Sequence, residues 1–174
     1  MSVVTIRPAN EQDAADLADL AERTFRDTFA TENNPADMAL HCAEHFGVAI
    51  QRQEILAPNH VILLAEVDTQ LAAFAQVRLH APKAGIAAPQ PAELQRLYVE
   101  KAWHGRGVAH KLMLQVLATA MQTGTETIWL GVWEHNPRAI AFYRKYGFQV
   151  VGEHVFQFGN DPQRDLVMAA TLND

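Results

Sequence analysis

The chain alternates β-rich runs with amphipathic segments, and this alternation restricts the fold to a mixed sheet flanked by helices. Helical periodicity covers 11–29 and 107–122, and helices are also expected from Asn34-Pro35, over 48–56 and from Asn136-Pro137. We therefore predict one domain over residues 1–174, of the mixed α/β class. Its sheet has about seven strands, expected at 3–7, 60–67, 71–79, 94–99, 127–133, 148–158 and 166–172.

Composition is that of a globular protein, with 49% hydrophobic and 20% charged residues. The 14 Lys and Arg are outnumbered by 20 Asp and Glu, and the formal charge of −6 opposes attraction to nucleic-acid phosphates. The single cysteine, Cys42, excludes a disulfide framework. No signal peptide and no apolar run long enough to span a bilayer is recognisable. We expect a cytoplasmic protein with no nucleic-acid or membrane partner.

The segment 94–122 combines a strand, a glycine-bearing turn and a helix. A helix N-terminus presents unpaired N–H groups and the positive end of the helix dipole, which favour phosphate oxygens. Gly105 and Gly107 allow the main chain to approach an anion closely. The P-loop pattern is absent, and His110 stands where the dinucleotide fingerprint requires Gly or Ala. On spacing alone, a turn without a ligand explains the segment equally well.

A second informative unit covers 129–148. Asn136 precedes Pro137 and is expected to cap a short helix, and Tyr143 lies two helical turns further on the same side. A cap and a half-packed surface aromatic residue are the structural explanations of these two positions.

Together the two units resemble the GCN5-related N-acetyltransferase (GNAT) superfamily, most strongly over 92–152. The pyrophosphate loop of that family reads Gln/Arg-x-x-Gly-x-Gly/Ala; His104 replaces its first residue, whereas Gly107 and Ala109 match. The resemblance implies a mostly antiparallel sheet whose central parallel pair, 94–99 and 127–133, splays apart to hold acetyl-CoA. It is carried by Leu97-Tyr-Val99, His104-Gly-Arg-Gly107-Val-Ala109, Asn136, Ala141-Phe-Tyr143 and Gly147-Phe148.

The resemblance also implies how acetyl-CoA is held. The strand segment Leu97, Tyr98 and Val99 is expected to pair with the pantetheine amides through its main chain. Asn136 is expected to hydrogen-bond the pantetheine arm, and Tyr143 to reach the thioester sulfur. The expected cradle for the pyrophosphate consists of His104, Gly105, Arg106, Gly107, Val108 and Ala109.

The implied reaction is direct attack of a neutral amine on the acetyl carbonyl. Tyr143 is the predicted acid for the departing thiolate, because a phenol can donate a proton to sulfur. Glu93 is the predicted base, acting directly or through water, since some family members place a glutamate on this strand. The alternative for Glu93 is an ordinary solvated carboxylate. The N–H of Leu97 is expected to polarise the carbonyl oxygen.

The acceptor is predicted from weaker similarities. Residues 24–29, 129–134 and 159–165 look similar to the spermidine/spermine acetyltransferase branch typified by PaiA, which implies a small polyamine-like amine. The acidic lining for such an amine is predicted to be Asp27, Glu32, Asp37 and Glu44; solvated helix faces are the alternative. Three other readings stay open: acetylation of a protein N-terminus or lysine, a non-catalytic acyl-CoA-binding module, and pairing of 148–158 or 166–172 across a homodimer interface.

One further pattern points to a different chemistry. The run His41-Cys-Ala-Glu44-His45 matches the inverted zinc-peptidase motif, in which two histidines share a helix face. A catalytic zinc site also needs a third protein ligand, and no matching motif follows downstream. We therefore expect no metal site.

Overall fold

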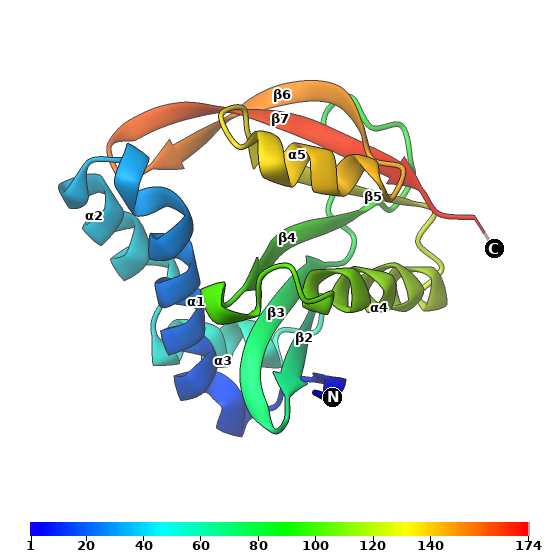
Figure 1. The fold of residues 1–174 in the computed structure, drawn as a ribbon. Helices are drawn as coiled ribbons and strands as arrows, with labels where there is room; N and C mark the ends of the chain where they lie inside the picture. The colour runs from blue at the N-terminus through cyan, green and yellow to red at the C-terminus, as the bar shows by residue number, and fades with distance from the viewer. Residues whose placement is uncertain (174) are drawn as a thin grey trace.

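The computed structural model describes residues 1–173 and contains one seven-stranded sheet, ordered β1-β2-β3-β4-β5-β7-β6 (Figure 1). Neighbouring strands are antiparallel except for β4 and β5, which are parallel. This confirms the predicted mixed sheet with one central parallel pair. The strands are β1 (Val4–Pro8), β2 (His60–Val67), β3 (Gln70–Arg78), β4 (Ala92–Val99), β5 (Thr127–Trp133), β6 (Gln149–Phe158) and β7 (Asp161–Thr171).

Five α-helices cover the two faces of the sheet (Figure 1). One core joins α1 and α2 to β2 and β3, around Leu17, Phe25 and Phe74. The second core lies on the opposite face, where α4 packs on the central strands through Leu112 and Val116. The helices are α1 (Ala14–Phe29), α2 (Pro35–His45), α3 (Val48–Leu56), α4 (Val108–Gln122) and α5 (Pro137–Arg144).

Asparagine caps begin three of the helical segments. The Asn10 side chain accepts the Gln12 N–H at 2.9 Å, and the Asp13 carboxylate accepts the Asn10 N–H at 2.8 Å, one turn ahead of α1. Asn34 and Asn136 accept N–H groups in the first turns of α2 and α5. Each cap pairs a donor that the helix itself cannot pair.

The parallel strands β4 and β5 stay paired over only a short distance. Their register contains two pairs, Ala92 with Ile128 and Glu93 with Trp129. Just beyond these pairs, the register between β3 and β4 shifts between Gln76 and Val77 of β3, which marks an irregularity in the ladder. Beyond this level, β4 and β5 form no further residue pairs within residues 1–173. Main-chain groups on the facing edges of the two strands therefore border an opening.

Two strands begin earlier than predicted. β4 begins at Ala92 rather than 94, and β7 begins at Asp161 rather than 166 although Pro162 follows. β7 pairs with β5 only from Asp165 onward, so Pro162 lies where β6 alone is its neighbour. Proline is tolerated at such a position because only one ladder needs hydrogen bonds. Within residues 1–173, no helix is long and apolar enough to cross a membrane.

Candidate functional site

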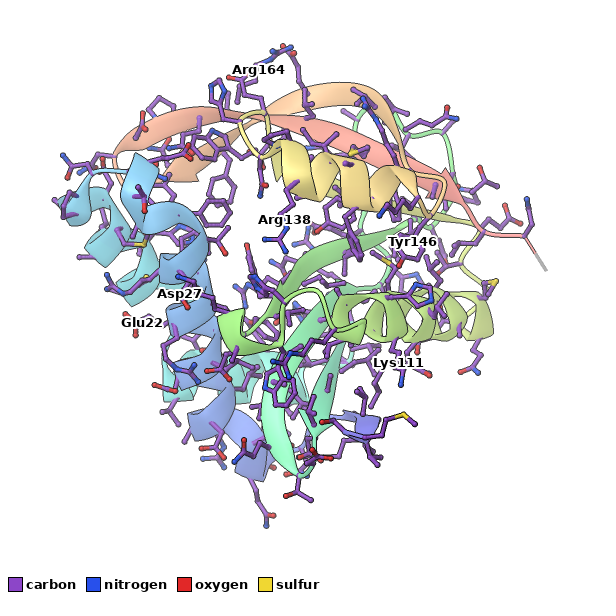
Figure 2. All side chains as sticks on the ribbon, viewed as in Figure 1. Glu22, Asp27, Lys111, Arg138, Tyr146 and Arg164 are labelled. Atoms are coloured by element: carbon purple, nitrogen blue, oxygen red, sulfur yellow. The ribbon has the colours of Figure 1, made fainter. Side chains whose placement is uncertain are left out.

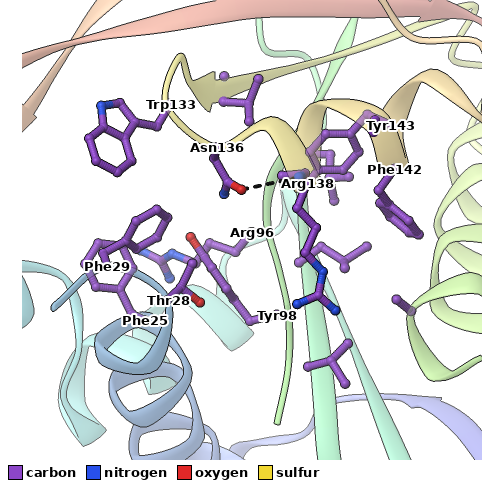
Figure 3. Close-up of a pocket in the computed structure, with 18 of the residues that line it drawn as sticks. Phe25, Thr28, Phe29, Arg96, Tyr98, Trp133, Asn136, Arg138, Phe142 and Tyr143 are labelled. Carbon is purple, nitrogen blue, oxygen red and sulfur yellow. Dashed lines mark hydrogen bonds between the residues drawn. The ribbon is translucent and has the colours of Figure 1, made fainter. Parts of the chain in front are cut away.

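A cavity of about 810 Å³ lies where β4 and β5 diverge (Figure 3). Its walls come from α1, β4, the turn before α4, β5, α5, β6 and β7. We distinguish two parts. The amide end is lined by residues 97–99 of β4, by 104, 105 and 107 of the turn, by 108–110 at the start of α4, and by α5. The aromatic end is lined by residues of α1, β6 and β7 together with Arg96 of β4.

The turn at the amide end presents unpaired main-chain donors. Gly105 and Gly107 have φ of +74° and +80°, in the left-handed region that glycine adopts without strain. The first hydrogen bond of α4 runs from Lys111 N–H to the Gly107 carbonyl, and within residues 1–173 the N–H groups of Val108 and Ala109 have no partner. A Cβ added at either glycine meets nothing within 4 Å, so the space beside the turn is open. This geometry suits a diphosphate.

His104 has a different role from the glycines that follow it. Its Nε2 atom donates to the Val99 carbonyl at 2.8 Å, which requires the proton to sit on Nε2. This bond fastens the turn to the end of β4. The carbonyl keeps a second lone pair that can accept another hydrogen bond.

Basic side chains surround the amide end. Arg138 projects from α5 into the opening, and Lys145 also lines it (Figure 2). Arg106, in contrast, stacks on Trp103, with its guanidinium carbon 5.2 Å from the ring centroid, and does not line the cavity. Lys111 is not a lining residue either. Sequence analysis missed Arg138 and Lys145, because isolated basic residues on a short helix carry no motif.

Asn136 and Tyr143 both line the amide end (Figure 3). The Asn136 Oδ1 atom accepts the Ala139 N–H at 3.3 Å, so one side of its amide caps α5 and its NH2 group can serve a ligand. Burial raises the pKa of the Tyr143 phenol to about 12. Tyr143 therefore keeps its proton near neutral pH and is a hydrogen-bond donor.

Four phenylalanines from two distant segments form the aromatic end. Phe25 and Phe29 come from α1, and Phe156 and Phe158 come from β6. Phe25 stacks on Phe158 with centroids 5.8 Å apart. Phe29 meets Trp133 edge to face at 6.1 Å, which joins α1 to the end of β5 across the cavity.

A buried guanidinium lies at the base of the aromatic end. Arg96 is 9% exposed, and its Nη1 atom donates to Glu54 at 2.8 Å and to Gln76 at 3.2 Å. Its guanidinium carbon lies 5.1 Å from the ring centroid of Phe46. Nε and Nη2 make no hydrogen bond within residues 1–173, and Arg96 lines the cavity.

A single carboxylate, that of Asp165, lines the cavity among the described residues. Asp165 is 6% exposed, and its Oδ2 atom lies 3.5 Å from the Nε2 atom of His154. Burial raises the pKa of Asp165 to about 7, against the lowering effect of Lys83, while burial and Lys83 lower the pKa of His154. A Cβ on Gly131 would lie 2.8 Å from His154 Nε2 and 3.1 Å from Asp165 Oδ2, so only glycine allows these groups to approach β5.

The predicted base Glu93 does not line the cavity. Its carboxylate pairs with Arg78 at 2.7 Å and is 14% exposed, and burial raises its pKa. Glu93 lies on β4, but the sequence gives no sign that its side chain meets Arg78. The predicted acidic lining is also absent from the cavity: none of Asp27, Glu32, Asp37 and Glu44 lines it.

The histidine motif of α2 forms no metal centre. Within residues 1–173, no group of three His, Cys, Asp or Glu side chains is placed to hold a metal ion. His41 is buried and stacks against both Phe25 and Phe158, with centroids 4.5 and 5.2 Å away. Burial, with the charges of His45 and Arg96, lowers the pKa of His41 to about 4, so this ring is a neutral part of the core.

Comparisons with known sequences identify relatives over nearly the whole chain. The sequence model of the family described as "Acetyltransferase (GNAT) family" matches residues 15–148. An uncharacterized N-acetyltransferase of Lactobacillus delbrueckii subsp. lactis is 29% identical over 172 residues, 99% of each chain. One of Mycobacterium tuberculosis is 32% identical over 160 residues, 92% of this chain and 98% of the relative. A probable spermine N(1)-acetyltransferase of Bacillus subtilis subsp. natto is 33% identical over 63 residues, 34% of this chain and 40% of its own.

The fold is also that of solved acetyltransferases. The PaiA N-acetyltransferase of Thermoplasma acidophilum, crystallised with coenzyme A, superposes with a TM-score of 0.79. The two chains are 21% identical, and the match covers 97% of this chain and 99% of the other. The superposition supports the fold described above.

Proposed function

The chain belongs to the GNAT family of acetyltransferases, and from this premise we propose that its cavity binds acetyl-CoA and that the protein transfers the acetyl group to a small primary amine. The observation that carries the proposal is the continuity of the cavity. At the amide end, the cavity has a turn with unpaired N–H groups, the open edge of β4 and the phenol of Tyr143. It continues from there into the aromatic end, where the carboxylate of Asp165 lines it.

In this proposal, the amide end holds the donor. The N–H groups of Val108 and Ala109 bind the diphosphate, together with the other main-chain groups of the turn 104–109, and Arg138 and Lys145 add positive charge. The inner edge of β4 at Leu97, Tyr98 and Val99 pairs with the pantetheine amides, because β5 has moved away from it. Asn136 donates from its free NH2 group to the same arm.

Tyr143 is proposed as the acid of the reaction. Attack by the amine forms the N–C bond, and collapse of the tetrahedral intermediate breaks the C–S bond and leaves a thiolate. The phenol, neutral because its pKa is raised to about 12, donates to that sulfur and regains a proton from the amine nitrogen or solvent. The N–H of Leu97 is the proposed donor to the carbonyl oxygen.

Asp165 replaces Glu93 as our proposed proton acceptor. An ammonium group must lose one proton before attack, and Asp165 lines the cavity whereas Glu93 does not. With its pKa raised to about 7, Asp165 exchanges protons efficiently near neutral pH. Of the two protons that the amine nitrogen loses, one passes through Asp165 to solvent and the other ends on the CoA sulfur.

The acceptor is proposed at the level of a small primary amine. The short match to a probable spermine acetyltransferase supports a polyamine-like molecule. The side chains that line the cavity give a polyamine no further support. A polyamine carries several ammonium groups, whereas Asp165 is the one carboxylate of the described residues that lines the cavity. Pairing of two copies along β6, which exposes Val150, Val151 and Val155, stays a prediction.

The proposal is tested by free-thiol release from acetyl-CoA in the presence of single amines, with calorimetry of acetyl-CoA binding in parallel. We expect binding in the absence of amine and thiol release that depends on amine. Binding without release would favour the non-catalytic acyl-CoA module, and release with lysine peptides alone would favour protein acetylation. Absence of binding would refute the donor site.

A further inference from the structure

The aromatic end contains two buried charges of opposite sign, and the mechanism above uses only one of them. Asp165 and Arg96 are 6% and 9% exposed, and both line the cavity. Glu54 pairs with the charge of Arg96, but the Nε and Nη2 donors have no hydrogen-bond partner within residues 1–173, and polar groups in a buried site usually have one. A simple amine acceptor would leave these donors beside the pocket without a partner.

The Arg96 guanidinium is only partly satisfied by the protein. Nη1 donates to Glu54 at 2.8 Å and to Gln76 at 3.2 Å, which fixes the orientation of the planar group. Guanidinium has five N–H donors, and within residues 1–173 those of Nε and Nη2 make no hydrogen bond. This free edge has the fork geometry that binds a carboxylate through two parallel bonds.

The two charges lie around one residue, Tyr98. Arg96, Tyr98 and Asp165 all line this cavity, and the pKa of the Tyr98 phenol is raised chiefly by burial, with Arg96 lowering it and Asp165 raising it further. Tyr98 in turn contacts the rings of Phe25 and Phe29, at 6.1 and 6.4 Å between centroids (Figure 3). The positive and negative groups therefore share one pocket, and that pocket has an aromatic wall.

We propose that the acceptor is an amino acid, or a similar small amino-carboxylate, with an aromatic or large apolar side chain. Arg96 binds its carboxylate, Asp165 lies beside its amine, and the phenylalanines of α1 and β6 contact its side chain. This inference rests on the proposed function, because it names the substrate class of the same site.

A polycation fits this pocket poorly. Among the described residues, Asp165 is the one carboxylate that lines it, so a second ammonium would find no partner. The fixed charge of Arg96 would repel that ammonium. A zwitterion satisfies both charges at once, and its apolar body needs no polar partner.

The test compares the kcat/KM values of four amines in the thiol-release assay: phenylalanine, phenylalaninamide, phenethylamine and spermidine. The second and third lack the carboxylate but keep the ring and the amine. We expect phenylalanine to exceed both by roughly 10- to 100-fold, the contribution of a charge-assisted pair of hydrogen bonds. We expect spermidine to be the poorest acceptor.

Two variants assign the preference to Arg96. R96Q removes the charge, and E54Q/R96Q also removes the half-buried carboxylate that R96Q would leave without its charge partner. In both, the ratio of phenylalanine to phenethylamine should fall to about one. The matched control is R78Q, which breaks the ion pair with Glu93 on the same sheet away from the cavity and should keep the ratio. Acetyl-CoA affinity measured by calorimetry establishes that each variant is folded.

The outcomes separate this inference from the proposed function. Thiol release with phenethylamine or spermidine at least equal to that with phenylalanine would overturn the amino-carboxylate and leave acetyl transfer standing. A preference for phenylalanine that survives in both Arg96 variants would also overturn it. Failure to bind acetyl-CoA, or no release with any of the four amines, would overturn both proposals.

Discussion

In the proposed function, the two ends of the cavity recognise their ligands by different means. The amide end offers main-chain N–H groups and a strand edge, supplied largely by the continuous segment 97–110 and completed by α5. The aromatic end offers side chains of α1, β4, β6 and β7 that are far apart in the sequence. Main-chain recognition tolerates many side chains but depends on backbone conformation, whereas side-chain recognition changes with each substitution. We therefore expect substitutions at the two ends to alter different kinetic parameters.

The largest effect is expected at the aromatic end, for D165N. An amide cannot accept the proton of the ammonium group, so turnover near neutral pH should fall about 100-fold or more, with acetyl-CoA affinity retained. D161N on the same strand is the control, since the Asp161 side chain is exposed and does not line the cavity. Equal turnover of D165N and the parent protein would remove Asp165 from the mechanism.

The same substitution should stabilise the fold in a pH-dependent way. Burial raises the pKa of Asp165 from 3.8 to about 7, so its ionisation disfavours the native state. The stability that the protonated form provides is complete below about pH 4 and is lost as pH rises through 7. Denaturant unfolding should therefore show D165N more stable by about 2–4 kcal/mol near pH 8, and no difference near pH 4. A constant difference across this range contradicts the prediction.

At the amide end, we expect G107V to weaken acetyl-CoA binding by roughly 30-fold. A β-branched residue is strained at φ +80°, and its side chain fills the open space beside the turn. G124V is a matched control, because Gly124 at the other end of α4 has the same φ of +80° and equally open surroundings. Calorimetry should show weaker binding for G107V alone, and a similar loss in both variants would indicate a general effect of strain.

Also at the amide end, Y143F should reduce kcat by more than about 10-fold with little change in acetyl-CoA affinity. The variant keeps the ring that packs against Phe148 and removes only the donor to sulfur. Single-turnover thiol release measures the chemical step directly. Unaltered turnover would assign Tyr143 to packing.

The smallest effect is expected for R106A, although the sequence assigns Arg106 to the pyrophosphate cradle. Its guanidinium stacks on Trp103, an exposed contact that contributes on the order of 0.5–1 kcal/mol to the conformation of the turn. Acetyl-CoA affinity should then change by less than about 5-fold. A larger loss would show that Arg106 leaves Trp103 and contacts the donor.

The sequence predicts the amide end much better than the aromatic end, for a physical reason. Gly107, Asn136 and Tyr143 belong to two short motifs whose spacing determines their geometry. Arg96 and Asp165, by contrast, face the cavity only because α1 and the β6–β7 hairpin fold over the sheet. Glu93 lies on β4, yet its pairing with Arg78 depends on a long-range register that spacing does not encode. The positions of most helices and strands follow from periodicity and caps. The early start of β7 at Asp161, by contrast, depends on pairing with β6.

The β6–β7 hairpin extends past the end of β5, and residues 161–163 of β7 pair within the sheet with β6 alone. The overhang contains three residues that line the cavity, namely Phe156, Phe158 and Gln163. Its tip is joined to α2, where the Asn160 N–H donates to the Asp37 carboxylate at 2.9 Å. In our proposal, this overhang therefore supplies part of the acceptor pocket, and its residues can be exchanged without disturbing the ladders beside the donor site, whereas Arg96 and Asp165 lie outside it. Such an arrangement lets a lineage acquire new substrates while it conserves its chemistry.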